Sequence, residues 1–158
     1  MGDDDIRLAE VPEPSPAPNE VKIEVKAAGV CGTDIHGHPS VRPPVILGHE
    51  LAGVIVELGR DCKTRKVGDR VISEPAKFLC GECRFCKQGL TALCLRRKGM
   101  SSSADGCFAP YVTILERSTH LLPEHTSLEA GALCEPLACA VHAVIEQARV
   151  QPGEFVVV

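Results

Sequence analysis

The chain has 158 residues, of which 17 are Lys or Arg and 21 are Asp or Glu, so its formal net charge is -4. This mild acidity gives no electrostatic basis for non-specific nucleic-acid binding, and 44% hydrophobic with 24% charged residues excludes disorder throughout. No stretch approaches the roughly 20 apolar residues of a membrane span, and residues 1–5 are polar and acidic, unlike a secretory signal. We therefore expect a cytoplasmic protein that binds neither membranes nor nucleic acid.

The first 115 residues are predicted to be rich in β-strands. After an exposed proline-rich lead-in over 12–18, apolar and charged residues alternate over 21–27, which is typical of a strand with one solvated face. Further strands, separated by glycines at turns, are expected at 51–58, 70–73 and 108–115.

Beyond residue 123 the pattern changes to a helical period. Thr126 and Glu129 fit a capping box, and a later helical face is apolar, formed by Leu137, Val141, Val144, Ile145 and Ala148. Because a proline disfavours a helical conformation for the residue before it, two helical pieces should meet near Pro136, with Glu135 in an extended kink. Residues 155–158 are predicted to form a buried strand.

Four of the nine cysteines form a compact metal-binding pattern. Cys80, Cys83, Cys86 and Cys94 follow the spacing C-x2-C-x2-C-x7-C, which lets one loop wrap four thiolates around a tetrahedral zinc. Basic residues that could offset the negative charge of such a site are Arg84, Lys87, Arg96, Arg97 and Lys98. An iron-sulfur cluster is the alternative, but its usual last spacer is x3 followed by proline, where this chain has x7 and Leu95. The pattern favours a structural zinc.

A second cluster of possible ligands lies at strand ends. Cys31 and His36 follow the first clear strand, and His49 and Glu50 directly precede the next. A lone histidine or cysteine is more often structural than ligating. The spacing by itself leaves both possibilities open.

Five motifs occur together in the order of one enzyme family. They are 28–36 (AGVCGTDIH), 47–50 (LGHE), 67–71 (VGDRV), the four cysteines, and 135–138 (EPLA). Over about 11–158 the sequence resembles the zinc-dependent medium-chain alcohol and polyol dehydrogenases of the sorbitol dehydrogenase type. The resemblance implies a mainly β fold with C-terminal helices: a GroES-like β-barrel catalytic domain over 1–150, with a structural zinc lobe at about 75–100. It also implies that 151–158 begin a nucleotide-binding Rossmann domain at which the chain is truncated.

The resemblance also implies roles for individual residues. Cys31, His49 and Glu135 match catalytic zinc ligands, Glu135 sometimes through water, and Glu50 matches the carboxylate beside the metal. Asp34 matches the acid that holds the zinc-bound histidine, and Thr33 and His36 match a relay for the alcohol proton.

The third ligand position has two rivals. Cys134 adjoins Glu135 and corresponds to the ligand of alcohol dehydrogenases in the narrower sense, but Glu135 precedes Pro136 as the polyol pattern requires. His142 is a weaker rival, because the seven helical residues between positions 135 and 142 rise about 10 Å, too far for both side chains to bind one zinc. Structural roles are expected for His38, His120, His125 and His142, and for Cys62, Cys107 and Cys139.

The implied reaction is zinc- and NAD(P)-dependent oxidation of a secondary alcohol, a polyol such as sorbitol or xylitol, to the ketone. Threonine 3-dehydrogenase or butanediol dehydrogenase activity is the alternative, as is an inactive zinc-binding fragment or a zinc-dependent interaction module. No G-x-G-x-x-G occurs in the chain, and the 18 positions from Cys31 to His49 are fewer than the family usually has. We expect the full-length protein to form homo-oligomers.

Overall fold

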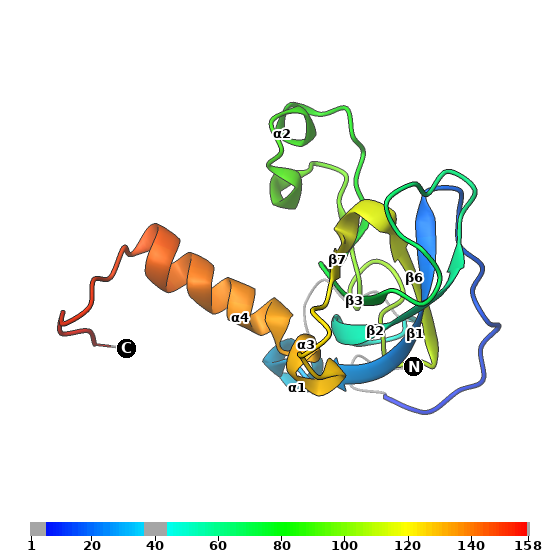
Figure 1. Ribbon diagram of the computed structural model, residues 1–158, viewed down its shortest axis with the longest axis horizontal. Helices are drawn as coiled ribbons and strands as arrows, with labels where there is room; N and C mark the ends of the chain where they lie inside the picture. The colour runs from blue at the N-terminus through cyan, green and yellow to red at the C-terminus, as the bar shows by residue number, and fades with distance from the viewer. Residues whose placement is uncertain (1–5, 37–43, 158) are drawn as a thin grey trace.

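The computed structural model describes residues 6–36 and 44–157, and its centre is an antiparallel five-stranded sheet in the order β6-β1-β2-β3-β7 (Figure 1). The strands are β1 (Glu20–Gly29), β2 (Glu50–Leu58), β3 (Arg70–Ser73), β6 (Tyr111–Leu115) and β7 (Thr119–Leu121). A second, two-stranded ladder pairs β4 (Ala76–Phe78) with β5 (Lys98–Gly99). The mainly β fold predicted from the sequence is confirmed. The strand expected over 108–115 begins only at Tyr111, because Pro110 has no N–H to donate to a ladder.

Aliphatic side chains fill the core, as the low aromatic content requires. Val21 and Ile23 of β1, Ile55 of β2, Val71 of β3 and Ile114 of β6 are each fully buried and pack in one cluster. Burying each such side chain contributes about 1.5–3 kcal/mol. This cluster holds together the strand ends that carry the candidate site.

Helical segments occur around the sheet and at the end of the chain. They are α1 (Gly32–His36), α2 (Arg84–Lys87), η1 (Thr91–Leu93), η2 (Glu116–Ser118), α3 (Leu128–Ala132), α4 (Cys134–Val141) and η3 (His142–Gln147). The predicted capping box at Thr126 is wrong by one residue. Ser127 caps α3, because its backbone is extended and its hydroxyl accepts a hydrogen bond from the Ala130 N–H at 3.1 Å.

The predicted extended kink at Glu135 is also wrong. Glu135 is the second residue of α4, and the junction with α3 falls at Leu133. Pro136 lies in the first turn of α4, where a backbone N–H has no intrahelical acceptor and its loss costs nothing. The preference against a helical residue before proline is thus overridden, and Glu135 is held on a regular helical turn.

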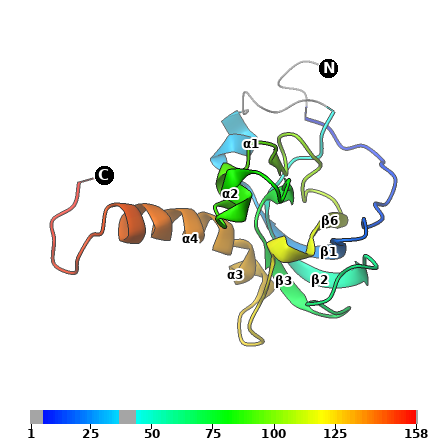
Figure 2. The ribbon, with the colours of Figure 1, turned by 90° about the horizontal axis from the view of Figure 1, so that it is seen from above.

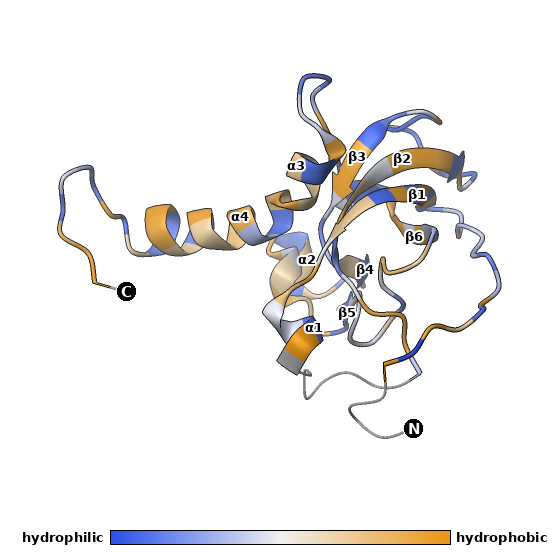
Figure 3. Ribbon diagram, turned by 90° about the horizontal axis from the view of Figure 1, so that it is seen from below, coloured by the Kyte–Doolittle hydropathy of each residue, from blue (hydrophilic) through white to orange (hydrophobic). Residues whose placement is uncertain are grey.

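The C-terminal part of the described chain extends away from the sheet (Figures 1 and 2). Leu137 and Ile145 on the apolar face of α4 and η3 are exposed, and Figure 3 shows hydrophobic residues along this helix. The buried strand predicted at 155–158 is wrong for its described residues, which form no strand and of which Phe155 is 94% exposed. No strand of the described chain lies beside them, and an extended segment needs a paired neighbour to satisfy its backbone. None of the described helices has the length and apolar character needed to cross a membrane.

Candidate functional site

The pairing of β1 with β2 brings two sequence-distant candidates together. Gly29 at the end of β1 lies opposite Glu50 at the start of β2, so Cys31 emerges beside Glu50. A Cβ added at Gly29 would lie 2.0 Å from Oε2 of Glu50. Gly29 therefore leaves the space in which the Glu50 carboxylate is buried.

Three of the predicted catalytic-metal residues converge. One ligand atom from each of Cys31, His49 and Glu50 lies within 4.8 Å of the others. Cys31 and His49 are partly buried and Glu50 is buried. Gly48 adopts a positive φ of 89° directly before His49, a backbone conformation that favours glycine.

Asp34 lies behind His49, as the resemblance implies. Its Oδ1 is 3.9 Å from Nδ1 of His49, and its side chain is 4% exposed. The carboxylate is held by the residue that precedes its helix, because Oδ2 accepts a hydrogen bond from the Cys31 N–H at 3.0 Å. A carboxylate beside the second ring nitrogen orients a ligating imidazole.

Ser101 joins the same network, and the sequence analysis missed it. Its hydroxyl donates to Oδ1 of Asp34 at 3.1 Å and accepts from the Gly48 N–H at 3.1 Å. Ser101 is buried and has a φ of 64°, a left-handed conformation that is uncommon outside glycine. No motif pointed to this residue, since a serine in a loop is ordinary in sequence and only the fold brings it to His49.

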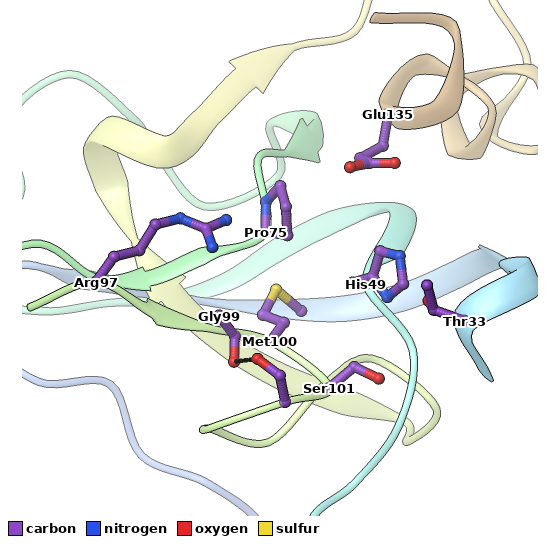
Figure 4. Close-up of a pocket in the computed structure, with 9 residues that line it drawn as sticks. Thr33, His49, Pro75, Arg97, Gly99, Met100, Ser101 and Glu135 are labelled. Atoms are coloured by element: carbon purple, nitrogen blue, oxygen red, sulfur yellow. Dashed lines mark hydrogen bonds between the residues drawn. The ribbon is translucent and has the colours of Figure 1, made fainter. Parts of the chain in front are cut away.

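A cavity of about 270 Å³ opens in front of these residues. Thr33 and His49 line it on one side, Glu135 from the start of α4 on another, and Met100 and Ser101 along its wall (Figure 4). The Glu135 carboxylate shares the cavity with His49 but does not belong to the close set of three ligand atoms.

Burial raises the pKa of Glu135, and the negative charge of Glu50 adds to this effect, whereas His49 and Arg97 oppose it. The carboxyl group therefore faces an environment that disfavours its charge unless a cation is near. Cys134, the rival ligand, does not line this cavity. It lines a second, more apolar cavity of about 470 Å³ together with Cys139 and His142.

The two predicted relay residues are only partly described. Thr33 lies exposed on α1 and lines the cavity beside His49. The backbone of His36 ends α1, but its side chain, like all of His38, lies outside the described residues.

The four-cysteine lobe, residues 75–100, projects from the sheet on the β4–β5 ladder (Figure 1). Its four sulfurs lie within 4.8 Å of one another, with Cys80 Sγ 3.9 Å from Cys86 Sγ and 3.6 Å from Cys94 Sγ. A tetrahedron with zinc-sulfur bonds of about 2.3 Å has sulfur-sulfur edges of roughly 3.8 Å. The sulfur positions fit such an ion.

The lobe's electrostatics also fit a cation. The Cys83 N–H donates to the Cys80 sulfur at 3.4 Å and is the main cause that lowers the pKa of Cys80 to about 6. Burial and hydrogen bonding to Cys94 raise the pKa of Cys86 to about 12. The Cys80 thiolate thus forms readily, whereas burial makes the Cys86 thiolate unfavourable. A divalent cation bound by the sulfurs would favour the thiolate form of both.

The remaining cysteines and histidines lie outside both clusters. All nine cysteines are free thiols. Cys107 is buried under β2, where its sulfur donates to the Glu50 carbonyl and burial raises its pKa to about 12. His120 pairs with Glu74 and His142 with Glu146 on the surface.

Arg97 is a second cavity residue that the sequence did not indicate; it was noted there only as a basic residue near the four cysteines. Arg97 lines the cavity, and Figure 4 shows its guanidinium across from His49 and Thr33, with Pro75 and Met100 between. The positive charge of Arg97 partly offsets the rise in the pKa of Glu135 that burial causes.

Comparison with known proteins shows a consistent set of relatives. Residues 17–124 match the family model described as the alcohol dehydrogenase GroES-like domain. The chain is 47% identical to a sorbitol dehydrogenase of Halalkalibacterium halodurans, over 96% of this chain and 45% of that protein. It is 39% identical to a D-arabitol-phosphate dehydrogenase of Enterococcus avium, over 99% of this chain and 46% of that protein.

Solved structures agree with the sequence matches. The crystal structure of 2R,3R-butanediol dehydrogenase from Bacillus subtilis superposes with a TM-score of 0.83 and 35% identity, over 95% of this chain and 46% of that one. The chain therefore spans about half the length of the relatives it matches.

Proposed function

The chain belongs to the alcohol dehydrogenase GroES-like domain family, and we propose that it carries the metal site of an enzyme that oxidises a secondary alcohol to a ketone with NAD(P). The proposed substrate is a polyol such as sorbitol or xylitol. The observation that carries the proposal is the convergence of Cys31, His49 and Glu50 at a cavity that Thr33 and Glu135 also line.

The donor set suits zinc at this place. A thiolate, an imidazole and carboxylates are the ligand types of catalytic zinc sites, which keep one position open. Cys31 and His49 would bind the ion, with Glu135 as a further ligand directly or through water and Glu50 beside it. When bound, zinc supplies Lewis acidity that makes an alcohol proton easier to remove.

The chain's own residues then have distinct tasks. Thr33, which lines the cavity with His49, would accept a hydrogen bond from the bound alcohol group. His36, which ends α1, would be the outer base of the relay. Asp34, held by the Cys31 N–H and the Ser101 hydroxyl, keeps His49 in one orientation. Met100 and Pro75 line the cavity with apolar surface that limits water.

The second proposed zinc is structural. Cys80, Cys83, Cys86 and Cys94 supply four thiolates and leave no open position. The lobe buries few apolar side chains, so the ion would supply much of its folding free energy.

Two substrate classes compete with polyols. A relative from Streptomyces avermitilis is named L-threonine 3-dehydrogenase, and a structural neighbour is named 2R,3R-butanediol dehydrogenase. We further propose that residues 151–157 lead into a nucleotide-binding domain that supplies the cofactor, and that the full-length protein is a cytoplasmic homo-oligomer.

The deciding assay offers sorbitol, xylitol, butanediol and threonine to the full-length protein that contains this chain, with NAD or NADP in turn. We expect polyol oxidation that is lost in Cys31→Ser and retained in Cys62→Ser, which removes a thiol remote from the cavity. Oxidation of threonine alone would replace the polyol assignment. An unchanged rate in Cys31→Ser would remove the metal site from the mechanism.

A further inference from the structure

Arg97 brings a positive charge to the cavity at a distance from the proposed reacting end. Its guanidinium faces the cavity from the β5 side, whereas His49 and Thr33 lie on the opposite side (Figure 4). The guanidinium also passes close to Gly99, because a Cβ on Gly99 would lie 3.3 Å from Nη1 of Arg97.

The lobe positions Arg97 but does not use its charge. The Arg97 N–H donates to the Cys94 carbonyl at 3.1 Å, which ties its backbone to one of the four cysteines. Its neighbour Arg96 serves the lobe instead, because the Arg96 side chain pairs with Glu82 and helps to lower the pKa of Cys80. Within 6–36 and 44–157, the Arg97 guanidinium makes no hydrogen bond or ion pair.

Glu135 does not neutralise Arg97 either. The two charges attract each other across the cavity, but they do not form an ion pair among the described residues. Glu135 lines the cavity together with His49 and would be engaged by the metal in the proposed function. A planar guanidinium with five donors and no carboxylate partner is suited to bind a phosphate or carboxylate through two parallel hydrogen bonds.

We propose that Arg97 forms a subsite for an anionic group, a phosphate or a carboxylate, carried by the alcohol substrate at some distance from the hydroxyl that is oxidised. The inference rests on the proposed function and narrows its substrate class from neutral polyols to anionic ones. The hydroxyl end lies against His49 and Thr33, and the anionic end reaches Arg97 past Pro75 and Met100. Arg97 is exposed, so water competes for its hydrogen bonds and added salt weakens the attraction.

The test measures binding directly and needs no turnover. The zinc-loaded full-length protein that contains this chain is titrated in a calorimeter with D-glucitol, D-glucitol 6-phosphate and D-gluconate at low ionic strength. Charge-assisted hydrogen bonding at a solvated site should make at least one anionic ligand bind about tenfold more tightly than D-glucitol. Comparing the phosphate with the carboxylate identifies which anion the subsite prefers.

Two variants separate this subsite from general electrostatics. Arg97→Gln should abolish the tenfold advantage and leave the dissociation constant of D-glucitol unchanged, whereas Arg96→Gln, one position away and equal in charge, should retain the advantage. Zinc content and the circular dichroism spectrum verify that both variants fold. Arg97→Lys, which keeps the charge but loses the planar fork, should retain only part of the advantage.

The possible results distinguish failure of the anionic subsite from failure of the proposed oxidation of a polyol. If D-glucitol and the anions bind equally, or if Arg97→Gln and Arg96→Gln reduce anion binding equally, the anionic subsite is wrong and the proposed oxidation of a polyol stands. If none of the three ligands binds the zinc-loaded protein, both the subsite and the polyol assignment are overturned.

Discussion

The Ser101 hydroxyl donates a hydrogen bond of 3.1 Å to Oδ1 of Asp34, although 67 positions separate the two residues. The same oxygen accepts from the Gly48 N–H, so one buried hydroxyl fixes both the carboxylate beside His49 and the backbone that precedes His49. Residues that orient a ligating histidine change metal affinity about 10–100-fold when they are lost. Ser101 is a positioning residue of this kind.

Replacing Ser101 by Ala should therefore lower the zinc affinity of the Cys31 site about tenfold and leave the zinc affinity of the lobe unchanged. The measurement is a chelator competition that resolves the two ions. Ser102→Ala is the matched control, because the Ser102 hydroxyl lines the same cavity but donates to the Gly99 carbonyl at 3.1 Å. Equal affinities in both variants would show that Ser101 has no part in orienting His49.

The two cysteine clusters should respond differently to loss of one thiol. With up to two zincs bound per chain, Cys83→Ser should lose one and unfold the lobe, because its fold depends on the ion. Cys31→Ser should also lose one zinc but keep the lobe, since the sheet core holds the first site together. Metal analysis and hydrogen exchange of residues 75–100 distinguish the two results. Full zinc content in both variants would refute both metal sites.

A substitution at Gly48 should destabilise the fold more than one at Gly68. Both have positive φ, 89° and 92°, so alanine costs about 1–2 kcal/mol of backbone strain at either position. At Gly48 a Cβ would also lie 2.4 Å from the Phe108 ring, whereas at Gly68 it would meet nothing within 4 Å. Urea unfolding should show Gly48→Ala to be the less stable variant by 1 kcal/mol or more, about the cost of a local clash. Equal stabilities would mean that the Phe108 ring moves aside freely.

The carboxylate of Glu116 should make stability depend on pH. Its Oε1 accepts hydrogen bonds from three successive backbone N–H groups, those of Lys63, Thr64 and Arg65, at 2.8, 2.6 and 3.0 Å. Burial alone would raise the pKa of Glu116, but these donors outweigh it and lower the pKa below 4.5. The ionised form is thus favoured in the folded state, and its contribution is complete above the unfolded pKa and lost as pH falls through the folded one.

Glu116→Gln should accordingly lower the free energy of unfolding by about 1 kcal/mol at pH 7, since the partly exposed site weakens charge-assisted bonds. The difference from the unmodified chain should shrink as the pH falls below about 4.5. Glu124→Gln, in an exposed loop, should show no such dependence. A constant difference across the pH range would exclude the carboxylate charge as its cause.

Local patterns predicted the central strands and pointed to candidate ligands, but they did not indicate the residues that support those ligands. Alternation marked β1, and spacing marked Cys80 and its partners, because both signals lie within short windows. Ser101 and Arg97 gave no such signal, since their roles depend on contacts with Asp34 and the cavity that only the folded chain creates. The extended conformation predicted for Glu135 from Pro136 is wrong, because α4 begins at Cys134 and so includes the residue before the proline.

Strand β1 contains a β-bulge, which determines where the chain can gain or lose a residue. Val25 pairs with Gly53 and Ala27 with Ala52, so Lys26 is an extra residue on this strand. Deleting Lys26 would remove the bulge and keep these pairs. Deleting Ala28, which pairs with Leu51, would instead shift Gly29 by one position against Glu50. Because successive residues face opposite sides of a sheet, that shift would turn Cys31 away from Glu50. Single-codon insertions and deletions between Ala27 and Cys31 should therefore be as damaging as loss of a ligand, whereas the exposed 12–18 segment should tolerate changes in length.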